Sequence, residues 1–137
     1  MRKLTEVEQA RALMTEAIDW SVMKWLVEKK RVRKTADKAN EVLNAAELEL
    51  RSKWSAKFKA LYDKPTTAPS ELKRLATKAR EEHEAANRLH VQAEGTFDGA
   101  EKRLSTAMAR EGCRQAIEGW EHHVEAIRLA ESALEIK

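Results

Sequence analysis

The sequence contains few of the residues that interrupt helices: four glycines and two prolines in 137 residues. An all-β fold needs many more turn residues than this, so the shortage argues against a sheet protein. Aromatic side chains make up only 5% of the chain and charged ones 36%. Together with the abundance of Ala, Glu, Lys, Leu and Arg, this composition is typical of long helices or coiled coils. We therefore expect an all-α protein.

Other shortages bear on location and partners. Cys113 is the only cysteine, so no disulfide within the chain can form and a reducing, cytoplasmic setting is expected; a Cys113 pair between two chains stays open. The most apolar stretch, residues 17–27, contains two charges and is shorter than the ~20 residues that cross a bilayer, so we expect no membrane partner. No apolar run follows the basic start, which argues against a secretory signal. The net charge of +3 does not by itself indicate a nucleic-acid partner.

The helical pattern has one strong interruption, at Pro65 and Pro69. Proline lacks an amide hydrogen and clashes with the preceding turn, so the first helix must end there. Thr5 and Glu8 have the spacing of a capping box at its start. An elongated antiparallel helical hairpin follows from this arrangement. We expect a single helical domain over residues 1–137, with a helix over 4–62, a turn over 63–70 and a helix over 71–135.

Apolar side chains recur every three or four residues on both helices, as in the seam of a coiled coil. The seam is bulky on the first helix and rich in alanine on the second, which lets large and small side chains interlock. One alternative stays open. Gly95–Gly99 has the composition of a turn, and Asp98 with Glu101 would then cap a third helix and give a three-helix bundle. Against a break there, Phe97 and Leu104 keep the heptad phase through the segment.

A second apolar face lies near the N-terminus, nearly opposite the seam at 100° per residue. A two-helix hairpin can bury only one stripe, so this face needs a covering helix. The cover comes from a third helix of the same chain, from a second copy in a four-helix dimer, or from another helical protein. We expect a non-catalytic scaffold or adaptor protein that self-associates or docks a partner on this face. Its residues are Leu13, Trp20, Met23 and Val27.

Basic residues gather around the expected hairpin tip, while the C-terminal end is acidic. A basic tip can bind phosphates or an acidic protein, and such binding weakens with salt. A nucleic-acid-binding hairpin is therefore the alternative function. The plainer interpretation is a solvated charged surface. The residues of this basic tip are Lys53, Lys57, Lys59, Lys73, Arg74 and Lys78.

Patterns of catalysis or metal binding are missing from the sequence. There is no glycine-rich phosphate loop and no Gly-x-Ser-x-Gly motif, and the nearest histidines to Cys113 along the chain lie more than two turns away. No histidine has a glutamate three positions before it, as di-iron bundles require. His122 and His123 project about 100° apart on a helix, while His83 and His90 fall on the seam and are interpreted as polar residues that fix register. We expect no enzymatic activity, no metal and no cofactor.

Overall fold

The structure, a computed structural model, describes residues 4–63 and 70–136; for residue 51 and residues 54–63 it describes the backbone alone. The described residues are mostly helical and contain no strand, which confirms the all-α expectation. The helices in chain order are α1 (Thr5–Ala17), α2 (Val22–Asp63), α3 (Ser70–Arg103) and α4 (Thr106–Leu134).

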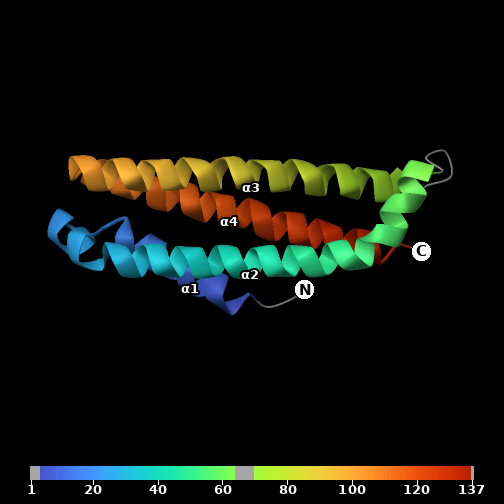
Figure 1. Cartoon of the computed structure of the whole chain (residues 1–137), viewed down its shortest axis with the longest axis horizontal. Helices are drawn as coiled ribbons and strands as arrows, with labels where there is room; N and C mark the ends of the chain where they lie inside the picture. Colours follow the sequence, from blue (N-terminus) through green and yellow to red (C-terminus); the bar gives the residue numbers. More distant parts are fainter. Residues whose placement is uncertain (1–3, 64–69, 137) are drawn as a thin grey trace.

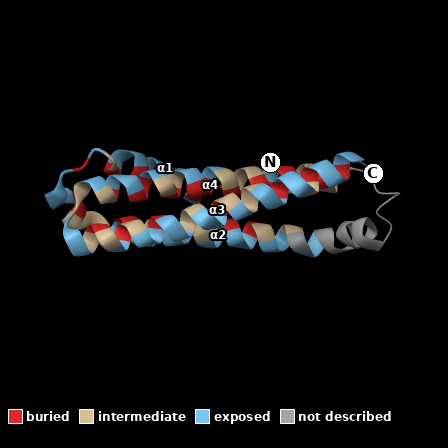
Figure 2. Ribbon diagram, turned by 90° about the horizontal axis from the view of Figure 1, so that it is seen from above, coloured by how far each residue is buried: buried red, intermediate tan, exposed pale blue. Residues whose placement is uncertain are grey.

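The four helices form an elongated bundle within one chain (Figure 1). The two helices whose backbones pack most closely are α3 and α4, and they run antiparallel. The long helix α2 lies along this pair, and the short α1 packs against α2 and α4. Buried residues form inward-facing stripes along the helices (Figure 2), as expected for amphipathic helices that share one core.

The expected continuous helix over 4–62 is wrong, because it is interrupted between Ala17 and Val22. Ser21 starts α2: its hydroxyl accepts a hydrogen bond from the Lys24 amide at 3.2 Å, and its carbonyl accepts one from the Trp25 amide at 3.0 Å. A serine that satisfies the free amides of a first turn favours a new helix start. The expected capping box at Thr5 is also wrong, since no side chain caps the start of α1.

The expected helix over 71–135 is interrupted too, although not in the Gly95–Gly99 segment. The helix α3 continues through that segment, as its heptad phase indicated, and ends at Arg103. Leu104 has a φ of 50° and the Ser105 amide donates to the Ala100 carbonyl at 3.1 Å, which is the hydrogen bond of a Schellman helix end. Ser105 then caps α4 by accepting from the Met108 amide at 3.2 Å. A three-helix bundle with its break near Gly95–Gly99 is therefore wrong.

The reversal at Leu104 makes α3 and α4 the tight hairpin of the molecule. A Cβ atom at Gly112 would lie 2.9 Å from the Phe97 ring, and one at Gly119 would lie 3.2 Å from the Leu89 Cβ. These two glycines therefore let the helices approach closely. The expected hairpin about Pro65 and Pro69 places α2 antiparallel to α3, as observed in Figure 1, but the prolines themselves lie outside the described residues.

The core is one long apolar cluster with a smaller one at the opposite end of the bundle from Leu104. In the main cluster the Trp25 and Phe97 rings are stacked, with centroids 5.6 Å apart and planes at 12°. Cys113 is fully buried, and this burial raises the pKa of its thiol to about 12. A disulfide between two chains would therefore require the bundle to open. The largest fully buried side chains are Met14, Leu43, Ile127, Val32 and Cys113.

Candidate functional site

The expected interaction face is divided by the fold. Leu13 and Trp20 are buried, with 8% and 5% exposure, whereas Met23 and Val27 are 71% and 76% exposed. The periodicity that placed all four on one face assumed a single straight helix, and the break before Val22 removes that assumption. The chain itself thus covers half of the predicted face. Whether the exposed half binds a partner stays a prediction.

Of the six large apolar residues that are exposed in the described part of the chain, four belong to or adjoin the two corners at one end of the bundle. The α1–α2 corner and the α3–α4 corner lie together at the left end of Figure 1. The exposed apolar side chains of the α1–α2 corner and the first turns of α2 are Val22, Met23 and Val27. At the α3–α4 corner, Leu104 is 60% exposed. Leu104 also has a left-handed backbone conformation, which costs a residue with a side chain about 1–2 kcal/mol. We name this surface the apolar end; it consists of Val22, Met23, Val27 and Leu104.

The basic tip lies at the other end, where the fold adds opposite charge. Lys53 is paired with Glu49 at 3.5 Å, and Arg74 donates to Glu71 at 2.9 Å. The acidic end of α4 packs beside the start of α3. Its Glu125 has a lowered pKa, mainly because Arg128 donates a hydrogen bond to it, with smaller contributions from the charges of Arg128 and Lys78.

The structure describes the side chains of only two of the remaining residues of the basic tip. Lys73 and Lys78 are exposed on α3. The side chains of Lys57 and Lys59 lie outside the described residues. Nucleic-acid binding at the basic tip therefore stays a prediction, and the neighbouring carboxylates weaken the positive field on which it depends.

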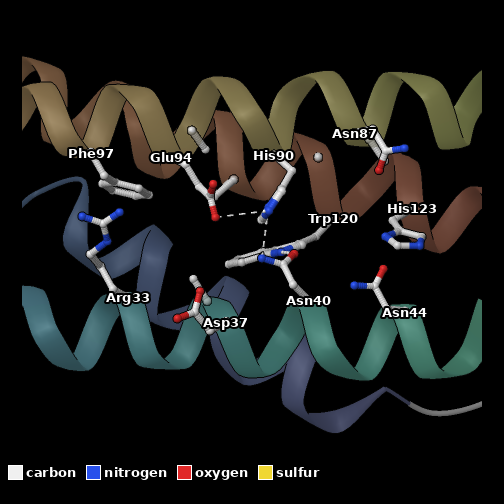
Figure 3. Close-up of a pocket in the computed structure, with 15 residues that line it drawn as sticks. Arg33, Asp37, Asn40, Asn44, Asn87, His90, Glu94, Phe97, Trp120 and His123 are labelled. Carbon is white, nitrogen blue, oxygen red and sulfur yellow. Dashed lines mark hydrogen bonds and ion pairs between the residues drawn. The ribbon is translucent and has the colours of Figure 1, made fainter.

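A polar pocket of about 110 Å³ opens between α2, α3 and α4 (Figure 3). The Trp120 indole donates to the Asn40 Oδ1 atom at 2.9 Å. Since an indole nitrogen can only donate, the orientation of the Asn40 amide is fixed, and its Nδ2 donates to His90 Nδ1 at 3.1 Å. The His90 proton then lies on Nε2, which faces a Glu94 oxygen at 3.3 Å. This chain of contacts holds α2 in register with α3 and α4.

Arg33 lines the pocket at the end opposite His123 (Figure 3). Its guanidinium donates to Asp98 at 2.9 Å and to Glu101 at 3.0 Å. Burial opposes the charge of Arg33, but the hydrogen bonds and negative charges of the two carboxylates outweigh it and raise the pKa of the guanidinium. Asp98 and Glu101, which would cap a third helix only in the alternative with a break near Gly95–Gly99, thus connect α3 to α2.

The fold also brings together Glu47, His83 and His123, one residue from each long helix. His83 Nδ1 lies 2.5 Å from Glu47 Oε1, and His123 Nε2 lies 3.2 Å from Glu47 Oε2. The two imidazole rings meet edge to face, with centroids 5.8 Å apart. Burial alone would raise the pKa of Glu47, but the two imidazoles outweigh it and hold this pKa below its ordinary value.

Sequence reasoning missed this cluster, because it considered only residues that share one helix. Glu47 was not among the candidates, His83 was expected to fix register, and His123 was considered only with its neighbour His122. His122 in fact pairs with Glu82 and stands outside the cluster. No local spacing joins positions 47, 83 and 123, so no motif search along the chain finds them.

No protein family, no curated protein and no solved structure matches this chain. In the part of the chain that the structure describes, none of the helices carries an apolar stretch long enough to span a bilayer. The candidate sites are the apolar end, the polar pocket and the Glu47–His83–His123 cluster.

Proposed function

We propose that this protein is a non-catalytic helical scaffold or adaptor that associates with a second copy of itself through the apolar end. The observation that carries the proposal is Leu104. Helices commonly close with glycine at this left-handed position, where glycine has no strain. A bulky, strained and mostly exposed leucine there is a feature that stability of the single chain does not favour.

Neighbouring side chains support an interface at the same end. Met23 and Val27 are far more exposed than the other apolar residues of the α2 N-terminal half. Methionine adapts its shape to a partner, which suits an interface. An exposed apolar cluster rimmed by polar residues is the usual sign of a protein-interaction surface.

The charges around the apolar end favour a second copy as the partner. Exposed residues of both signs adjoin it in sequence: Glu16 and Asp19 are acidic, and Lys24 and Arg103 are basic. Lys24 lies 3.7 Å from Glu16 within the chain. A surface with both signs can match itself across a two-fold axis, as symmetric dimers require. Four apolar side chains cover much less than the roughly 1,600 Å² of a standard interface, so the association is expected to be weak and concentration-dependent.

Sedimentation of the wild-type chain over a concentration series tests the proposal. The average mass is expected to rise with concentration, and the double variant M23D/V27D is expected to stay at the mass of one chain with unchanged helicity. Leu48 and Val91 are similarly exposed but lie on the helix bodies, so L48D/V91D is the matched control and should associate like the wild type. A wild-type mass that stays at one chain throughout the series would reject self-association.

A further inference from the structure

The Glu47–His83–His123 cluster has the composition and arrangement of a metal site. Its three donor atoms lie within 4.8 Å of one another and come from α2, α3 and α4. A tetrahedral ion with bonds of about 2.0–2.1 Å places its ligands about 3.3 Å apart. The His123–Glu47 pair, at 3.2 Å, already has about this spacing, and the His83–Glu47 pair, at 2.5 Å, is closer. We infer that Glu47, His83 and His123 bind a divalent transition metal of the Zn²⁺ class.

The simpler alternative is a buried ion pair without metal, and the orientation of the rings argues against it. His83 Nδ1 and His123 Nε2 are shut off from solvent, yet neither has a hydrogen bond of ordinary geometry although the Glu47 carboxylate is within reach. The His123 side chain is only 9% exposed. Buried polar atoms are normally satisfied. A metal ion between the three side chains would satisfy both nitrogens through their lone pairs.

Asn87 supplies an outer contact of the kind that metal sites use. Its side-chain amide lies 3.0 Å from His83 Nε2, the ring nitrogen that faces away from Glu47. The oxygen and nitrogen of an amide group are assigned from its surroundings, so either atom can face the ring. With the Asn87 oxygen toward the ring, His83 donates from Nε2 and presents the Nδ1 lone pair to a metal, as metal-bound histidines do.

The donor set and its surroundings define the ion and the open coordination position. Two imidazoles and one carboxylate suit Zn²⁺, whereas Mg²⁺ and Ca²⁺ prefer oxygen ligands alone. Three protein ligands leave the fourth position of a tetrahedral site for water. His123 also lines the polar pocket, at the end where Figure 3 shows Asn44 and Asn87. The pocket thus lies directly beside the cluster.

Zn²⁺ titration of the chelator-treated full chain by calorimetry tests the site. The wild type is expected to bind one ion per chain. H123Q and E47Q each remove a ligand and should lower the affinity by more than about 100-fold, while N87L removes an outer contact and should lower it by about 10- to 100-fold. H122Q is the matched control: the neighbouring histidine pairs with Glu82 outside the cluster, so its loss should leave the affinity unchanged.

Two further measurements distinguish metal binding at the cluster from binding at another histidine and from a loss of binding caused by misfolding. His90 and Glu94 form a four-residue-spaced pair on α3, and E94Q keeps an oxygen that can accept from His90. Equal losses in E94Q and H123Q would overturn the proposal in favour of binding at this pair. If a ligand variant does not fold, the test uses the wild type alone, with Co²⁺ added in place of Zn²⁺ and its visible absorption spectrum recorded. The strong visible absorption of a four-coordinate Co²⁺ ion supports the site, and the weak absorption of a six-coordinate ion overturns it.

Discussion

The two sides of α3 are packed differently. On the α4 side, Gly112 and Gly119 let two helix backbones approach, and buried apolar side chains line the contact. Polar pairs such as Thr96 with Gln115 lie beside them. On the α2 side, longer polar side chains cross the gap: Arg33 reaches Asp98, and Asn40 reaches His90. Apolar packing supplies free energy with little directionality, whereas each buried polar pair needs one particular partner. The comparison indicates that the α3–α4 pair supplies much of the stability and that the polar contacts of α2 fix its register.

The largest effect is expected where the two sides meet, at Phe97. Its ring stacks on Trp25 of α2 and lies against Gly112 of α4. The variant F97A should lower the free energy of unfolding by about 3–5 kcal/mol, because it leaves a cavity at this junction. Urea denaturation followed by circular dichroism measures the loss. V91A is the control on the same helix and should stay within about 0.5 kcal/mol, since Val91 is exposed.

Cys113 tests whether the α4 side excludes water. Burial raises the pKa of its thiol from 9.0 to about 12, so the reactive thiolate at pH 8 should be about 1,000-fold scarcer in the folded chain than in the unfolded one. The rate of Cys113 alkylation, measured by mass spectrometry, should therefore be lower by at least that factor in native buffer than in urea. The pKa of the Cys113 thiol is higher in the folded chain than in the unfolded one. The free energy of unfolding should therefore fall as the pH rises from 9 toward 12. Rapid native labelling at pH 8 would show that this interface is open.

The glycines separate close packing from helix propensity. At Gly112 an added methyl group would contact the Phe97 ring, so G112A should cost about 1–3 kcal/mol. At Gly95 nothing lies within 4 Å of an added Cβ, so G95A should stabilise the chain by up to about 1 kcal/mol through helix propensity alone. Thermal and urea unfolding of both variants measures the difference. The same sign for both would mean that α3 and α4 are farther apart than the structure shows.

Much of the core could be predicted from sequence, whereas the helix pairing could not. The heptad spacing correctly predicted one buried stripe on each helix, where the structure buries Val32, Leu43, Ala93 and Phe97, because an amphipathic helix buries the same stripe against any neighbour. It failed at Leu104, which the seam includes and the structure exposes. Both helix breaks depend on single serines that cap without an acidic residue three positions later, and a leucine in the left-handed conformation has no sequence signature.

The candidate sites show the same limit. Part of the apolar end could be predicted from the sequence, since Met23 and Val27 belong to the second apolar face that a two-helix hairpin cannot bury. Its other half, Leu104, becomes exposed only because α3 ends there. The Glu47–His83–His123 cluster depends on the register of three helices, which polar contacts between distant residues determine. Local patterns carry no information on such contacts.

The smallest effect is expected at Arg33, and it tests the polar side directly. Its side chain is 33% exposed, so solvent screens its pairs with Asp98 and Glu101. R33M keeps the aliphatic stem and should cost only about 0.2–1 kcal/mol in low salt. The cost should shrink as NaCl is added, since salt screens the lost pairs. R114M is the control, because Arg114 pairs at 3.5 Å with Glu111 of its own helix and connects no other. An equal, salt-independent cost for both variants would mean that Arg33 adds nothing specific between α2 and α3, and the register would then rest on Asn40 and Glu47.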